Sequence, residues 1–238
     1  MATRDEAAEL TRRLAALPLF RGVPPDGLRR IQGLARPHKV RARQCFFNEG
    51  DAAKTFFVLT SGRVKLTQVT PEGHQVVLRI IGEGEAFGGA GAFGDLTYPV
   101  SAEAVEPARA LAWTSTAMRQ LMETEPRLAL NAVQFVAGRL HDLQRRYRQL
   151  MTERVERRVA RALLRLAHQA GRSVEAGVQI AFPVSRQDVA EMTGTTLYTV
   201  SRLLSAWEAR GIVLSGRQRI TLTQPLALIS LAEDLLEP

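Results

Sequence analysis

Two side chains near the C-terminal end of the chain, Tyr198 and Arg202, carry groups that can read the edges of nucleic-acid bases. An arginine presents a planar fork of N–H donors that matches two acceptors at once, such as O6 and N7 of guanine. A tyrosine hydroxyl can add one hydrogen bond. Because the two residues are four positions apart, they would lie on the same face of a helix. Such a face suits the major groove of DNA.

Apolar residues at helical spacing predict the helix that would position these two side chains. Four of them follow the i, i+3, i+4, i+7 pattern of a buried stripe: Val200, Leu203, Leu204 and Trp207. The residues that this stripe leaves facing outward are Tyr198, Ser201, Arg202 and Ser205. The helix therefore has one face for a protein core and one face free for a groove.

The stretch that precedes this helix predicts a second helix and a tight turn. Ala190 is small enough to allow close helix packing, and Gly194 tolerates the positive φ that a turn needs. Thr195 or Thr196 can cap the start of the second helix, whose free N–H groups suit a phosphate. These features together predict a helix-turn-helix.

The segments on either side of this motif predict a winged helix. Residues 178–182 are expected to form a short strand, and residues 211–223 a β-hairpin. The tail, residues 226–236, is expected to form a terminal helix.

The positive charge of the chain is concentrated around the same motif. The net charge is +8, and residues 139–219 contain fifteen arginines and no lysine against seven acidic residues, which accounts for the whole excess. The rest of the chain is balanced. This clustering favours a polyanionic partner.

Residues 126–151 predict a long helix with a narrow apolar seam. The seam residues alternate three and four positions apart, and are Val133, Val136, Leu140, Leu143, Tyr147 and Leu150. So narrow a stripe predicts a parallel homodimer with these residues at its interface. A helix packed on its own β domain remains the alternative.

The first half of the chain reads as short helices followed by a β domain. Apolar residues within 5–35 are broken by prolines and glycines, and residues 37–113 alternate β-branched and aromatic segments with turns about every ten residues. This pattern predicts an antiparallel sandwich or barrel, and argues against a Rossmann-type fold.

The order of these β segments resembles the CRP/FNR family (catabolite activator and fumarate–nitrate regulator) of bacterial transcription regulators. The resemblance rests on residues 48–51, 56–59, 61–62, 64–66 and 72–73. It implies an α+β chain with a cyclic-nucleotide-binding-type β jelly roll, a long dimerisation helix and a C-terminal winged helix-turn-helix. The expected domains are residues 1–125, 126–151 and 152–238.

The resemblance also implies which residues contact DNA. Ser185, Arg186 and Gln187 match the family's contacts at the start of the first motif helix, and Arg202 matches its guanine-reading arginine. Leu197 and Tyr198 depart from the family, so a different half-site is expected. The full expected set is Ser185, Arg186, Gln187, Thr195, Thr196, Leu197, Tyr198, Thr199, Ser201, Arg202 and Arg217.

The effector pocket that the resemblance implies is degenerate. Family members that bind cyclic nucleotides carry Gly-Glu and Arg-Ser/Thr-Ala, whereas this chain has Gly88–Gly89 and Val100–Ser101–Ala102. Without the arginine, a buried phosphate would lack its charge partner, so cyclic AMP in the usual mode is not expected. The glycine-rich backbone after Phe87 leaves another nucleotide open.

Cofactor binding is not predicted, although haem remains an alternative. The single Cys45 can form neither an internal disulfide nor a thiolate cluster, and we expect it to be a small buried residue. The candidate haem ligands are His38, His74, His141 and His168, of which His74 and His141 are the better placed. No metal site is expected.

The sequence shows no set of residues typical of an enzyme active site. The remaining alternatives are a haem-dependent gas or redox sensor of the same family, a regulator without an effector, and a ligand- or partner-binding adaptor without DNA readout.

The chain lacks a signal peptide or apolar span, so it is expected to be cytoplasmic and not bound to membrane. The expected partners are double-stranded DNA, a second copy of the chain and RNA polymerase.

Overall fold

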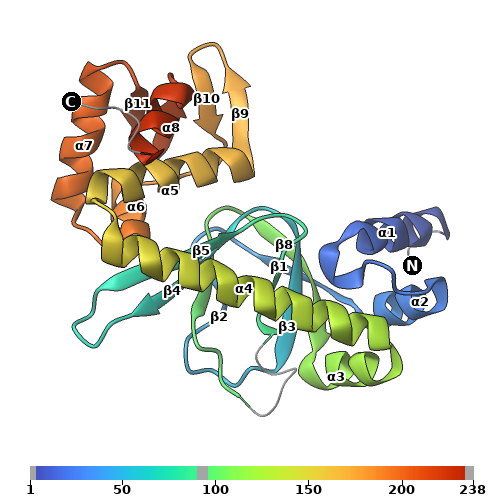
Figure 1. The fold of residues 1–238 in the computed structure, drawn as a ribbon. Coiled ribbons are helices and arrows are strands. Elements are labelled where there is room, and N and C mark those ends of the chain that lie inside the picture. Colours follow the sequence, from blue (N-terminus) through green and yellow to red (C-terminus); the bar gives the residue numbers. More distant parts are fainter. Residues whose placement is uncertain (1–3, 90–95, 234–238) are drawn as a thin grey trace. The chain divides into compact units, whose positions relative to one another are not determined.

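The computed structural model describes residues 4–89 and 96–233 (Figure 1). Contacts within the chain define two compact units, residues 1–64 with 81–144 and residues 65–80 with 145–238. Among the described residues, no helix is both long and apolar enough to cross a bilayer.

Short helices pack around the first hydrophobic core. They are α1 (Arg4–Ala16), the 3₁₀ turn η1 (Pro18–Phe20), α2 (Pro25–Leu34) and α3 (Ser115–Thr124). Leu14, Phe20 and Ile31 are almost completely buried in this core beside Trp113. The Trp113 indole N–H donates to the Ile31 carbonyl at 2.8 Å, which satisfies its one buried polar group. The short helices expected over residues 5–35 are therefore present.

In the part of the chain that the structure describes, eight strands form the β domain, and each strand pair with an assigned register is antiparallel. The strands are β1 (Arg36–Val40), β2 (Cys45–Phe47), β3 (Thr55–Ser61), β4 (Val64–Val69), β5 (Gln75–Ile81), β6 (Ala86–Phe87), β7 (Ser101–Ala104) and β8 (Ala108–Thr114). They build two sheets, of order β1-β8-β3-β6 and β2-β7-β4-β5. The predicted double-sheet β fold is confirmed.

Cys45 is exposed, contrary to the prediction of a buried residue. Cys45 and Phe47 are two positions apart, so in a regular strand they would share one face. The β2–β7 register shifts between them, because Cys45 faces Glu103 whereas Phe47 faces Ala102. This irregularity allows Phe47 to be buried while Cys45 remains at the surface.

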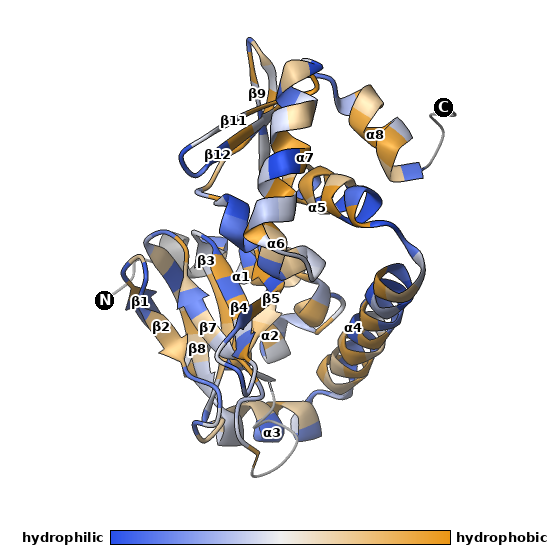
Figure 2. Ribbon diagram, turned by 90° about the vertical axis from the view of Figure 1, so that its left-hand side faces the viewer, coloured by the Kyte–Doolittle hydropathy of each residue, from blue (hydrophilic) through white to orange (hydrophobic). Residues whose placement is uncertain are grey.

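Helix α4 (Pro126–Thr152) is the longest helix among the described residues. Its first turns join the core through Leu128 and Ala132, which are buried. Figure 2 shows hydrophobic and hydrophilic residues alternating along the rest of the helix. The helix thus has one anchored end and a long amphipathic body.

The C-terminal part is a winged helix-turn-helix, as predicted. Its elements are α5 (Val155–Ala170), β9 (Gly171–Val174), β10 (Gly177–Ile180), α6 (Arg186–Thr193), α7 (Leu197–Ala209), β11 (Val213–Gly216), β12 (Arg219–Leu222) and α8 (Pro225–Glu233). The sheet order is β11-β12-β10-β9. The expected terminal helix is α8, and residues 234–236 of that prediction lie outside the described residues.

Candidate nucleic-acid interface

Helix α6 begins with a capping box that orients the first motif helix. The Ser185 hydroxyl accepts a hydrogen bond from the Asp188 N–H at 3.0 Å, and the Asp188 carboxylate accepts one from the Ser185 N–H at 2.9 Å. Two N–H groups at the helix start are satisfied in this way. The Ser185 hydroxyl, expected to contact DNA, is thus also part of the helix cap.

The turn between α6 and α7 has the geometry that the sequence predicted. Gly194 ends α6 with φ of 61°, a left-handed conformation that side chains disfavour, and its N–H donates to the Ala190 carbonyl. Of the two threonines considered for the cap of α7, Thr196 fills the role, because its hydroxyl accepts from the Thr199 N–H at 3.1 Å. Thr195 precedes it in the turn.

An arginine of α5 holds this turn in place, and the sequence did not identify it. The Arg158 guanidinium donates to the carbonyls of Thr193 (3.0 Å), Glu153 (2.8 Å) and Gly194 (3.5 Å). These carbonyls lie at helix ends, where no further turn supplies a donor. Arg158 therefore links α5 to the motif.

Helix α7 is pinned by its apolar face. Val200, Leu204 and Trp207 are buried, and the Trp207 indole N–H donates to Glu156 of α5 at 3.1 Å. Leu203, predicted to share this core, is only half-buried. It lines an open hollow on α7 together with Tyr198 and Arg202.

The opposite face of α7 is polar and open. Tyr198 is 70% exposed, and Arg202 and Ser205 are also exposed. The Arg202 guanidinium lies over the Tyr198 ring, 5.8 Å from its centroid. At this distance the ring attracts the cation and biases its direction. The two residues predicted to read bases are thus brought together.

Arg186 is held inside the motif, although the sequence predicted it as a DNA contact. Its guanidinium donates to the Ser215 hydroxyl of β11 at 2.7 Å and lies 3.6 Å from the Glu208 carboxylate of α7. Glu208 also accepts from the Ser215 N–H at 2.6 Å. This cluster joins α6, α7 and the wing, which is the hairpin of β11 and β12.

The other predicted contacts lie on α6, on α7 and between β11 and β12. Gln187 is exposed and donates to Glu191 at 2.9 Å, Leu197 is 47% exposed, and Arg217 is exposed at the turn of the wing. Thr199 and Ser201 are half-buried.

Comparisons with known proteins agree with this architecture. Residues 37–125 match the family model described as "Cyclic nucleotide-binding domain", and residues 157–231 match "Crp-like helix-turn-helix domain". The chain belongs to the CRP/FNR family. It is a family of transcription regulators with a helix-turn-helix DNA-binding domain.

Three relatives show how far this similarity extends. The "Cyclic AMP receptor protein" of Thermus thermophilus is 28% identical over 218 residues, which cover 92% of this chain and 98% of that protein. The "CRP-like cAMP-activated global transcriptional regulator" of Mycobacterium tuberculosis is 25% identical over 205 residues, covering 86% and 92%. A solved CRP-family transcriptional regulator, also from Thermus thermophilus, superimposes with a TM-score of 0.71 at 25% identity, covering 82% and 96%.

In this CRP/FNR-family chain, several other arginines of the positive cluster also have internal partners. Arg157 donates to the Ala232 carbonyl of α8, and Arg161 lies 3.3 Å from the Glu153 carboxylate. A local charge excess in the sequence therefore does not by itself mark a binding surface.

The seam predicted on α4 is exposed in the isolated chain. Its six residues, Val133, Val136, Leu140, Leu143, Tyr147 and Leu150, are between 49% and 64% exposed. An apolar row of this length is unusual on the surface of a monomer.

The predicted effector region is crowded with aromatic rings. Phe87 stacks on Phe57 with centroids 5.2 Å apart, and Phe47 stacks on Tyr98 at 3.7 Å. At Gly88, which has φ of 73°, a Cβ atom would lie 3.0 Å from a backbone oxygen and 3.1 Å from the rings of Phe47 and Phe57.

The polar groups expected in the same region have partners or lie beyond the described residues. The Ser101 hydroxyl accepts a hydrogen bond from the Glu49 N–H at 2.9 Å. Val100 is half-buried, and Gly89 lies 3.6 Å, measured from an ideal Cβ, from the Phe56 ring. Residues 90–95 of the glycine-rich stretch lie outside the described residues.

The four histidines weighed as haem ligands differ in their surroundings. His38 lies among aromatic rings, 5.4 Å from both Phe46 and Phe57 by ring centroids. All four histidines are exposed. In the described part of the chain, no three His, Cys, Asp or Glu residues gather closely enough to hold a metal ion.

Proposed function

We propose that this chain is a homodimeric regulator that reads a specific DNA sequence with helix α7. The observation that carries the proposal is the division of α7 into two faces. Val200, Leu204 and Trp207 fix the helix from below, while Tyr198 and Arg202 remain exposed above. A helix held in this way can enter a major groove with its reading residues already oriented.

The proposed readout differs from a simple arginine–guanine contact. Arg202 can donate to O6 and N7 of guanine, while Tyr198, in contact with Arg202, can donate one hydrogen bond to a neighbouring acceptor. Leu197, at the first position of α7 and 47% exposed, offers an apolar surface for a thymine methyl group. We therefore propose a half-site in which a guanine lies beside a thymine.

The proposed dimer forms through the exposed seam of α4. In a parallel dimer of two α4 helices the seam residues would meet their own counterparts across a two-fold axis. A two-fold axis also places two α7 helices for successive major grooves, about 34 Å apart. Leu143→Glu should give monomers in sedimentation analysis, while Gln144→Glu, which adds the same charge to an exposed position beside the seam, should leave dimers.

We propose that the β domain does not take cyclic AMP in the usual mode. Val100 offers no charge to a phosphate, and the rings of Phe57, Phe87 and Tyr98 make the neighbourhood apolar. A cyclic phosphate moved there would lose its hydration without gaining an arginine. Calorimetric titration with cyclic AMP should give no saturable heat, and submicromolar binding would contradict this part of the proposal.

Selection of DNA sites from a random pool tests the DNA-binding proposal. The full chain should enrich a palindrome whose half-sites lie about one helical turn apart. Affinity for the selected site should fall steeply with salt, because arginines release counterions from phosphates. An adaptor without DNA readout would enrich no motif.

RNA polymerase is the protein partner that we propose at the selected sites. Co-sedimentation of the chain with RNA polymerase on that DNA checks this proposal.

A further inference from the structure

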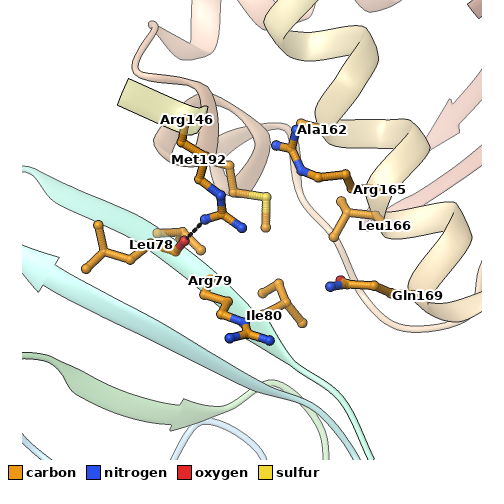
Figure 3. A pocket seen from close by; sticks show the side chains of 10 residues that line it. Leu78, Arg79, Ile80, Arg146, Ala162, Arg165, Leu166, Gln169 and Met192 are labelled. Atoms are coloured by element: carbon orange, nitrogen blue, oxygen red, sulfur yellow. Dashed lines mark hydrogen bonds between the residues drawn. The ribbon is translucent and has the colours of Figure 1, made fainter. Parts of the chain in front are cut away.

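A pocket in the unit formed by residues 65–80 and 145–238 lies outside the DNA-reading face. Its walls come from β5, the end of α4, α5 and α6, and none of its lining residues belongs to α7 or the wing (Figure 3). The recess is small, with a cavity volume of about 30 Å³, or about 350 Å³ when the open space at its mouth is included.

Two arginines from different helices converge on this pocket. Arg146 comes from the last turns of α4 and Arg165 from the middle of α5, and Figure 3 shows both guanidinium groups extending beside Met192. Arg146 donates a hydrogen bond to the Leu78 carbonyl of β5, which fixes it at the pocket wall.

The surroundings of Arg165 disfavour the positive charge of its guanidinium group. Burial, and after it the positive charges of Arg146, Arg145 and Arg161, together lower the pKa of Arg165 to about 10. Glu153 opposes them most weakly, and its carboxylate already lies 3.3 Å from Arg161. The side chain is still charged at neutral pH, so an anion in the pocket would offset like-charge repulsion.

We propose that this pocket binds a small phosphorylated anion, held by charge-assisted hydrogen bonds from Arg146 and Arg165. A phosphate presents several oxygens and up to two negative charges, so it can accept hydrogen bonds from two guanidinium groups at once. A single carboxylate has fewer oxygens and one charge, and is a poorer partner for two guanidinium groups. Gln169, which is exposed, adds an amide at the rim. The bound anion would link α4 to α5.

A DNA phosphate has the same chemistry but fits the pocket less well. The lining residues form a recess that is separate from α7 and the wing, the elements that the DNA proposal uses. The ligand of this pocket is therefore a soluble anion and not the DNA backbone.

Calorimetric titration of the full chain with sodium pyrophosphate, in dilute chloride buffer, tests the proposal. We expect saturable binding that Arg165→Gln weakens at least about tenfold, the effect of losing one charged hydrogen-bonding partner. The matched control is Arg154→Gln, which removes an exposed arginine from the start of α5 outside the pocket. It should change the affinity by less than about twofold. Absence of saturable binding, or an equal loss in both variants, would overturn the proposal.

Thermal unfolding separates anion binding from a purely structural role of Arg165. Pyrophosphate should raise the Tm of the wild-type chain more than sodium chloride does at equal ionic strength. Arg165→Gln should remain folded, with a Tm no lower than wild type without the anion, and should lose this rise, and Arg165→Lys should keep part of it. If Arg165→Gln lowers the Tm and the rise persists, the pocket is structural and the proposal is wrong.

A DNA-binding measurement on the same variants distinguishes the two sources of phosphate. Arg165→Gln should bind a random-sequence duplex with an affinity within about twofold of Arg154→Gln. A much larger loss of DNA affinity, together with no pyrophosphate binding, would assign the pocket to the DNA backbone and overturn the proposal. This outcome would leave the DNA-binding function of α7 intact.

Discussion

Helices α5 and α7 both carry arginines within the same positive segment, yet these side chains meet different surroundings. On α5, Arg158 is held by three backbone carbonyls and Arg161 by Glu153. On α7, Arg202 is exposed and lies over the ring of Tyr198. The same residue type thus supports the fold on one helix and is available to a partner on the other.

The difference follows from what each helix packs against. Helix α5 lies beneath α6 and α8, whose ends expose carbonyls that need donors, so its arginines are drawn into the protein. The Tyr198 face of α7 is instead exposed. Substitution of an α5 arginine that has internal partners, such as Arg158, should therefore lower stability, and substitution of the exposed residues on α7 should alter DNA readout.

The largest expected effect is the loss of stability on Arg158→Ala. Three carbonyl acceptors would lose their charged donor, which should lower the free energy of unfolding of the C-terminal unit by about 2–3 kcal/mol. Urea unfolding measures the change. The exposed Arg154→Ala is the control and should shift the free energy by no more than about 0.5 kcal/mol. If Arg158→Ala and Arg154→Ala lower the free energy of unfolding equally, the hydrogen bonds of Arg158 do not stabilise the unit.

A smaller loss of stability is expected for Gly194→Ala in the turn. The φ of 61° would place an L side chain in the left-handed region, and its Cβ would lie 3.2 Å from Leu150. The cost should be about 1–2 kcal/mol in urea unfolding. Gly216→Ala, where an added Cβ meets nothing within 4 Å, should be close to neutral. A neutral Gly194→Ala would mean that the turn is not rigid.

The smallest expected effect is that of Tyr198→Phe on base preference. The ring that contacts Arg202 remains, and one hydroxyl is lost, so affinity for the selected site should fall by about 0.5–1.5 kcal/mol. Fluorescence anisotropy with the selected duplex and a scrambled one gives the value. The unfolding free energy should not change, because the side chain is 70% exposed. A lower free energy of unfolding for Tyr198→Phe would contradict the view that the exposed face of α7 serves DNA readout and not stability.

Local patterns were sufficient to predict most of the fold. The apolar spacing on α7 identified Val200, Leu204 and Trp207 as its buried face, and Gly194 identified the turn, because both depend on residues near in sequence. The seam of α4 was visible for the same reason. Strand β9 was missed, since its residues are mostly exposed and show no alternation.

Tertiary partners could not be predicted in the same way. Nothing near Arg158 or Arg186 in sequence shows that one meets the carbonyls of the turn and the other Ser215 and Glu208. Cys45 was misplaced because the register shift beside it depends on the pairing with β7. Such contacts are set by how distant segments pack.

Repeating the site selection with Arg202→Ala tests the central claim most directly. We predict that the variant keeps the half-site spacing and the unfolding free energy of the wild type. It should lose the preference for one guanine–cytosine pair in each half-site, at a cost of about 1–3 kcal/mol in affinity for the original site. An unchanged base preference at every position would contradict the claim that α7 reads DNA through Arg202.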